Sequence, residues 1–320
     1  MRRRILWFGL VGLCISIWVC NSSLFSHPFA QRPVWLAHRG VHQDYTHTGL
    51  TDESCTARFI YPPKTSYIED TLPAIGEAFR DGADFVDFDV HPTNDGHWVV
   101  FHDWRLECRT NGHGVTRQQS LQYLQTLDVG YGYTADGGAT FPLRGKGVEL
   151  MPSLENVLQG FPDRSFIVHI KSNDPNDGKE LARTLRNLSG NQISRLSVTG
   201  GDRPIRALRE NLPSVRSMSP SSIKNCLKTY ALLGEFGYVP TACRNTVLFV
   251  PTNVGPWLWG WPDRFLGRME KVNTLVFAVD DLQSGGTKGL NDAKDLAKLP
   301  RNYTGGIWTD RIESIHDPKH

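Results

Sequence analysis

From residue 34 onward, short apolar runs rich in Val, Ile and Phe alternate with longer stretches in which apolar residues recur every three or four positions. The short runs predict buried strands, and the longer stretches predict amphipathic helices. The predicted strands cover residues 34–37, 84–90, 97–101, 165–170, 195–198, 214–218, 246–250, 274–279 and 306–309. The predicted helices lie near residues 71–80, 153–159, 178–188, 203–211, 221–233, 262–271 and 291–299.

This alternation of strand and helix is typical of a parallel sheet, because parallel strands need a crossover connection. Eight strands drawn from nine candidates, over about 280 residues, predict an α/β protein with a TIM-like (β/α)8 barrel. A doubly wound open sheet has the same alternation and is the alternative. The helix at 71–80 carries clear end signals: Asp70 or Thr71 as its cap, Pro73 in its first turn and Gly82 at its stop.

Two stretches, 41–68 and 103–150, depart from the alternation and are rich in Gly, Thr, Tyr and Asp. Loops of this length inside a compact domain are usually functional or form a small insertion. Each follows a predicted strand at its carboxyl end, where a barrel builds its active site. We therefore expect one barrel domain over residues 31–320, with an insertion at about 103–150 after the third strand.

The first 30 residues have a different character. Three arginines, Arg2 to Arg4, precede an apolar run at 5–20, and the next charged residue is Arg32. This pattern predicts a signal peptide or a membrane anchor, although the run is short of the about 20 residues that span a bilayer. The body is then expected to be exported, periplasmic or extracellular, and associated with a membrane through this segment.

Cysteine usage agrees with export, since four of the six cysteines lie in the body and disulfides persist in oxidising compartments. Four cysteines allow three connectivities, and buried free thiols are the alternative. We expect neighbours in the chain to pair: Cys55 with Cys108, and Cys226 with Cys243.

Composition excludes little beyond nucleic-acid binding. The net charge of +2, with 39% hydrophobic and 21% charged residues, describes an ordinary globular protein without a basic stripe. Composition therefore argues only against nucleic acid; the expected partner, a small molecule or a lipid headgroup, follows from the residues at the strand ends.

Charged and titratable residues follow several predicted strands, at the ends that meet at the mouth of a barrel. They are His38 and Arg39, Asp87 and Asp89, His102 and Asp103, His169 and Lys171, and Asp310. Asp87 and Asp89 are two apart on a strand and point to the same face. Two such carboxylates can hold a hard divalent cation such as Mg²⁺ or Ca²⁺.

The other members of this set match phosphodiester hydrolysis. Arg39 and Lys171 supply fixed positive charge, and a guanidinium matches the forked geometry of a phosphate. His38 and His102 can share proton transfer, one taking a proton while the other donates one. Glycoside hydrolysis fits less well, because its carboxylates flank the bond from opposite sides.

The chain resembles the glycerophosphodiester phosphodiesterase family in "AHRG" at 37–40 and in "IEDTLPAIGEAFRDGADFVDFDVHPTNDGHWVVFHDWRLECRTNGHGVT" at 68–116. The resemblance recurs at "LDVGYG", "MPSLENVL", "FIVHIKS" and "GIWTDRI". It implies a TIM-like barrel, one divalent metal and hydrolysis of glycerophosphodiesters to glycerol 3-phosphate and an alcohol. It also implies catalytic roles for His38 and His102, phosphate binding by Arg39 and Lys171, and a place for Glu69 in the pocket.

Three positions depart from the family pattern. Asp87 stands where the family has glutamate, Asp70 where it has asparagine, and His169 where it offers a metal-binding glutamate. An imidazole suits Zn²⁺ or Mn²⁺ better than Ca²⁺. The metal is therefore expected on Asp87 and Asp89, with either His169 or Glu69 and water. Two alternatives stay open: a phospholipase D-like or sphingomyelinase-like lyase that leaves a cyclic phosphate, and a non-catalytic phosphodiester-binding protein.

Overall fold

A computed structural model describes residues 2–23, 26–46, 54–282, 288–301 and 303–315. Eight parallel strands form its barrel in the order β6-β5-β4-β2-β1-β9-β8-β7. They are β1 (Val34–His38), β2 (Phe85–Pro92), β4 (Ser165–Ile170), β5 (Leu196–Gly200), β6 (Arg216–Met218), β7 (Val247–Pro251), β8 (Leu275–Val279) and β9 (Gly306–Thr309). The gap between β6 and β7 is bridged by Thr246, whose hydroxyl donates to the Ser217 carbonyl at 2.6 Å. The barrel is therefore nearly closed, which confirms the predicted fold class.

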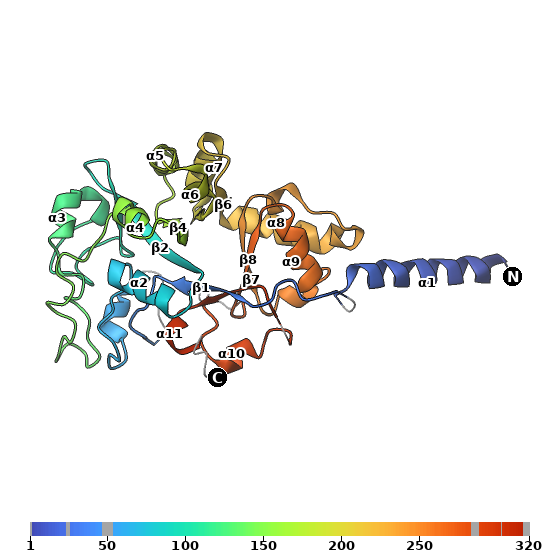
Figure 1. Ribbon diagram of the computed structural model, residues 1–320, viewed down its shortest axis with the longest axis horizontal. Helices are drawn as coiled ribbons and strands as arrows, with labels where there is room; N and C mark the ends of the chain where they lie inside the picture. Colours follow the sequence, from blue (N-terminus) through green and yellow to red (C-terminus); the bar gives the residue numbers. More distant parts are fainter. Residues whose placement is uncertain (1, 24–25, 47–53, 283–287, 302, 316–320) are drawn as a thin grey trace.

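The helices α2 to α11 connect the strands and surround the barrel (Figure 1). They are α2 (Leu72–Arg80), α3 (Leu121–Gln125), α4 (Leu154–Gly160), α5 (Pro175–Leu185), α6 (Gly190–Ser194), α7 (Asp202–Asn211), α8 (Pro220–Leu233), α9 (Asp263–Glu270), α10 (Ala293–Leu296) and α11 (Ile312–Ile315). Short 3₁₀ turns are η1 (Thr56–Phe59), η2 (Thr116–Gln118), η3 (Gly234–Phe236), η4 (Thr241–Cys243) and η5 (Gly255–Trp257). Thr71 caps α2 by accepting the Ala74 N–H, so the predicted start of this helix is confirmed.

The strands are apolar on both faces because each face meets a different core. Residues such as Val86, Val168 and Val198 point outward and pack against the helices. Leu36 and Phe277 belong to a smaller cluster that fills the barrel interior. Burial on both faces is the reason why these strands read as continuous apolar runs rather than as alternating ones.

The predicted strand at 97–101 is not a strand of the barrel. It forms β3 (Trp98–Val100), which pairs antiparallel with β2. Because β2 continues to Pro92, the chain turns back there, and the Phe101 N–H donates to the Asp89 carbonyl at 3.0 Å. This hairpin returns the chain to the mouth, so His102 reaches it although its strand runs in the opposite direction.

The insertion between β3 and β4 has its own core. Leu106, Leu124 and Leu143 pack there with Ile60 and Ile68 from the earlier long stretch. Both expected disulfides are present: Cys55–Cys108 joins the two long stretches, and Cys226–Cys243 joins α8 to η4.

The N-terminal segment forms α1 (Arg2–Asn21), which projects from one end of the molecule (Figure 1). Within the described residues, we find no helix with both the length and the apolar character that a membrane crossing requires. The prediction of a signal peptide or anchor at residues 1–30 stays a prediction.

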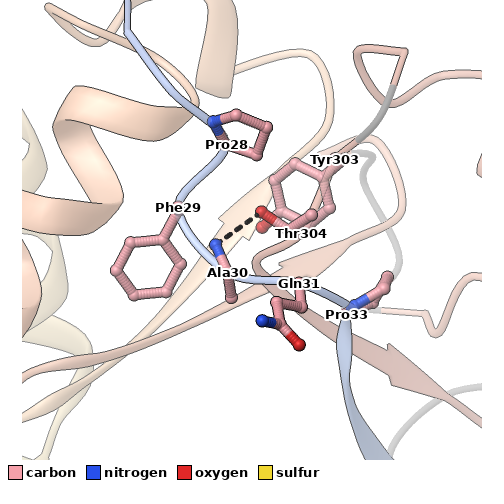
Figure 2. Close-up of a pocket in the computed structure, with 7 residues that line it drawn as sticks. All are labelled: Pro28, Phe29, Ala30, Gln31, Pro33, Tyr303 and Thr304. Carbon is pink, nitrogen blue, oxygen red and sulfur yellow. Dashed lines mark hydrogen bonds between the residues drawn. The ribbon is translucent and has the colours of Figure 1, made fainter.

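The chain that follows α1 is fastened near the amino ends of the barrel strands. Phe29 donates its N–H to Asp263, and Ala30 donates to the Thr304 hydroxyl at 3.1 Å (Figure 2). The residues drawn in Figure 2 line a cavity of about 750 Å³. Thr304 lies just before β9, whereas Asp310 follows the opposite end of that strand. This cavity therefore lies away from the barrel mouth and contains none of the predicted site residues.

Candidate active site

The turn after β1 brings an imidazole and a guanidinium into the mouth. His38 is the last residue of β1, and Arg39 adopts a left-handed conformation with φ of 54°. Gly40 follows with φ of 78°, and a Cβ on it would lie 2.7 Å from the Ala74 carbonyl carbon. Only glycine fits this close approach to α2, so the His-Arg-Gly sequence is a sharp turn against a helix.

Arg39 is the centre of the charge arrangement. Its guanidinium lies 3.0 Å from Glu69 and 3.0 Å from Asp89. Burial alone would lower the pKa of Arg39, but the negative charges of these two carboxylates outweigh it and raise the pKa. Arg39 is therefore held as a permanent cation at the mouth, the state that phosphate binding requires.

Asp89 lies among three cationic or basic groups. Besides Arg39, it contacts His169 Nδ1 at 2.7 Å and Lys171 Nζ at 3.6 Å. Asp89 and His169 are register partners on β2 and β4. Burial by itself raises the pKa of Asp89, and the charges of Lys171 and Arg39 lower it well below its usual range.

Asp87 has neutral donors instead. It accepts the Arg39 backbone N–H at 2.8 Å and the Trp308 indole N–H at 3.1 Å. Burial raises its pKa. Asp87, Asp89 and His169 do not converge as a compact three-ligand group in the described part of the chain.

His38 forms a pair with a carboxylate that comes from the far end of the sequence. Its Nδ1 lies 2.5 Å from Asp310 Oδ1, and its ring packs at 4.7 Å between centroids on Trp308. The other Asp310 oxygen accepts from Asn291 Nδ2 at 2.8 Å. Burial by itself raises the pKa of Asp310, but the His38 hydrogen bond and charge lower it below its usual range. Asp310 thus stays ionised and orients the imidazole.

His102 has a carboxylate partner of its own. Its Nδ1 lies 2.6 Å from Asp103 Oδ1. Burial, helped by the charge of Arg39, lowers the pKa of His102 to about 4. Asp103 remains ionised with a pKa of about 2, because the charge of Arg109 outweighs the effect of burial. His102 is therefore neutral at pH 7 in this arrangement.

Arg109 connects the two halves of the site, a role that the sequence reasoning did not assign to it. Its Nε lies 3.0 Å from Asp103, and its Nη1 lies 2.9 Å from Glu69. Nη1 also donates to the Tyr133 hydroxyl, and Nη2 donates to the Thr56 hydroxyl, each at 2.6 Å. The side chain is only 2% exposed. A continuous chain of charges therefore runs from His102 through Arg109 and Glu69 to Arg39.

The structure thus brings the predicted catalytic, phosphate-binding and metal-binding residues into one mouth, pairs Asp103 and Asp310 with the two histidines, and adds Arg109. Both carboxylate oxygens of Asp70 are buried, and neither has a hydrogen-bond partner in the part of the chain that the structure describes. Burial, together with the nearby negative charge of Asp89, raises the pKa of Asp70. Unpartnered carboxylate oxygens beside a second carboxylate are donors that a hard divalent cation prefers. Asp310 is one of the predicted strand-end residues, whereas Arg109 lies in the irregular insertion, where no strand end marks it.

Residues 38–204 match the model of the glycerophosphoryl diester phosphodiesterase family. The Bacillus subtilis protein YhdW is 31% identical over 268 residues, which cover 79% of this chain and 93% of YhdW.

The chain belongs to the glycerophosphoryl diester phosphodiesterase family.

A Caldanaerobacter subterraneus glycerophosphodiester phosphodiesterase is 34% identical over 103 residues, 32% of this chain, and the match spans only 39% of that relative. Two solved structures share the family fold. The glycerophosphoryl diester phosphodiesterase domain of a Mycobacterium tuberculosis protein has a TM-score of 0.64 at 17% identity, with 91% of this chain and 100% of the domain covered. An Oleispira antarctica phosphodiesterase in complex with sn-glycerol-3-phosphate has a TM-score of 0.53 at 16% identity, covering 89% and 95%.

Proposed function

We propose that this chain is a phosphoric diester hydrolase that cleaves glycerophosphodiesters to glycerol 3-phosphate and an alcohol. The observation that carries the proposal is the pair of histidine–carboxylate couples, His38–Asp310 and His102–Asp103, in the same mouth as the buried guanidinium of Arg39. Family membership and the glycerol phosphate product in the Oleispira structure support this substrate class.

The roles follow from charge and protonation. Arg39 and Lys171 bind the phosphate oxygens and stabilise the charge that develops on them. One histidine takes a proton from the attacking water as the water oxygen bonds to phosphorus and the phosphorus–oxygen bond to the alcohol breaks. The other histidine gives its proton to the leaving oxygen. The carboxylate behind each imidazole fixes its orientation and stabilises its protonated form.

The site also suits a hard divalent cation, Mg²⁺ or Ca²⁺. Asp87 and Asp89 would hold it, with the carboxylate of Asp70 near Asp89 as a further oxygen donor. When bound, such an ion supplies positive charge that stabilises the phosphate oxygens. His169 would orient Asp89 within this set, since its Nδ1 is hydrogen-bonded to that carboxylate at 2.7 Å.

Replacing each histidine by asparagine tests the function. In His38→Asn or His102→Asn, turnover of glycerophosphocholine is expected to fall at least a hundredfold, because proton transfer supplies about 10²- to 10⁴-fold. Phosphorus NMR follows the products, and circular dichroism checks the fold. A chelator should remove wild-type activity and Mg²⁺ or Ca²⁺ should restore it. Near-wild-type turnover in either variant would refute the assignment, whereas a cyclic phosphate as the end product would indicate a lyase.

We further propose that the protein is exported and lies at a membrane through α1. The helix exposes large apolar side chains such as Trp7 and Phe8, and Leu232, Phe236 and Trp257 are exposed on the barrel body. η3, which contains Phe236, also contacts α1. The full chain is expected to float with vesicles containing anionic lipid. Recovery only in the dense fraction at every lipid concentration would contradict this placement.

A further inference from the structure

His42 is a buried imidazole that has no part in the proposed reaction. Its Nδ1 lies 2.9 Å from the carbonyl oxygen of Gln43. Because a carbonyl only accepts hydrogen bonds, this nitrogen carries a proton, and Nε2 is the ring nitrogen that offers a lone pair to a metal when the imidazole is neutral. Nε2 is buried with no hydrogen-bond partner among the described residues, and His42 is only 7% exposed. An unsatisfied buried group of this kind destabilises the fold unless a ligand meets it.

Two further donors surround the same point. Ligand atoms of His38, His42 and Asp310 all lie within 4.8 Å of one another. The two imidazole rings stand perpendicular, with centroids 5.9 Å apart. Asp310 is held from behind, because its Oδ2 accepts from Asn291 Nδ2 at 2.8 Å and from the Gly289 N–H at 3.2 Å. Outer partners of this type orient the ligands of metal sites.

We propose that His38, His42 and Asp310 form a second metal site, selective for a borderline cation such as Zn²⁺. Two imidazoles and one carboxylate are a donor set that zinc prefers. The cation site proposed around Asp87 and Asp89 is instead dominated by oxygen and suits harder ions. The two sets share no residue, so they can be occupied by different metals.

The consequence for the reaction is inhibition, and this part rests on the proposed function. A His38 imidazole that coordinates Zn²⁺ has its lone pair engaged and no longer exchanges a proton with substrate. Zn²⁺ therefore stops turnover that Mg²⁺ or Ca²⁺ supports. The site acts as a metal-dependent switch on the catalytic histidine.

Calorimetric titration of the full chain with Zn²⁺, without substrate, tests the site itself. The key variant is His42→Asn, whose amide keeps a donor near the Gln43 carbonyl and lacks the second ring nitrogen. We expect wild-type protein to bind Zn²⁺ and His42→Asn to bind it at least tenfold more weakly. His97→Asn, at an exposed position on the β2–β3 hairpin outside both proposed sites, is the matched control and should retain wild-type Zn²⁺ affinity.

Histidine ring NMR of the wild-type chain gives a second readout that does not depend on any variant folding. The Nε2 signal of His42 should show the unprotonated form and shift on addition of Zn²⁺. Equal Zn²⁺ affinity in wild type and His42→Asn, or an unmoved His42 signal at saturation, would overturn the proposal. The ratio of rates with and without Zn²⁺ then measures inhibition. If the proposed function is wrong, there is no turnover from which to measure inhibition, but the Zn²⁺ affinities from calorimetry still test the site.

Discussion

At the scale of single residues, the site depends on side chains whose charge is fixed by a neighbour. Asp310 and Asp103 remain ionised behind His38 and His102, and Arg39 remains cationic between Glu69 and Asp89. In each case burial opposes the charged form and a nearby opposite charge overcomes it. The strained left-handed backbone of Arg39 is the local cost of this arrangement.

A substitution at Arg109 should show whether this residue positions the catalytic groups or binds the substrate. In Arg109→Lys the charge remains, but a single ammonium cannot contact Asp103, Glu69, Tyr133 and Thr56 together. We expect kcat to fall at least tenfold and the pH dependence of kcat/KM to shift, because the charge that holds Asp103 behind His102 moves. KM should change less than threefold.

The matched control is Arg105→Lys, in the same insertion, whose arginine forms an exposed pair with Glu107. Steady-state kinetics over a pH series, with thermal unfolding to measure stability, compares the two variants. An Arg109→Lys enzyme with a wild-type pH profile and kcat would show that Arg109 only stabilises the insertion.

At the scale of elements, the two disulfides have different positions relative to the site. Cys55 precedes Thr56, and Cys108 precedes Arg109, so this disulfide joins the backbone beside two hydrogen-bonded members of the network. Cys226–Cys243 lies in the helical layer, away from the described site residues. The first links the site to the insertion, and the second links α8 to the turn before β7.

Two double variants, each with one disulfide replaced by serines, should therefore differ from each other more in kcat than in the free energy of unfolding. The loops closed span 53 and 17 residues, so chain entropy predicts losses of about 4 and about 3 kcal/mol in the free energy of unfolding. We expect only the Cys55→Ser/Cys108→Ser enzyme to lose more than tenfold in kcat at a temperature where both variants are folded. Denaturant unfolding and kinetics measure the two effects, and equal kcat in the two double variants would contradict this link.

At the scale of the whole molecule, two buried histidines predict how stability depends on pH. Burial lowers the pKa values of His91 and His102 to about 4, whereas an unfolded histidine has a pKa of about 6.5. Between these values the unfolded chain binds more protons, so the free energy of unfolding falls as the pH falls. The slope is at most about 1.4 kcal/mol per pH unit for each histidine.

Urea denaturation at intervals from pH 7 to pH 4.5 measures this slope. His91→Gln should reduce it by about half, and His97→Gln, at an exposed position, should leave it unchanged. The aspartates contribute in a different window: the low pKa of Asp103, about 2, gives stability that is lost only below about pH 4. A free energy of unfolding that is flat between pH 6.5 and 4.5 would contradict the burial of both imidazoles.

By itself, the sequence determined the alternation of strands and helices and the chemistry at the strand ends. These features are local: the apolar period reports burial, and the last residue of a parallel strand lies at the mouth whatever the connecting helices do. His38, Arg39, Asp87, Asp89, His169 and Lys171 could be placed together for this reason. The short helix α10 was expected to be longer, because its period continued past the point where packing ended it.

The tertiary structure alone decided which of these groups contact one another. His38 and Asp310 are 272 positions apart and meet because β9 pairs with β1 as the barrel closes. Arg109 lies in an irregular insertion without a period, so only folding against Thr56 and Glu69 revealed its place. Charge pairing and buried, unpartnered atoms depend on distances across the fold, and these distances are set by packing rather than by neighbours in the chain.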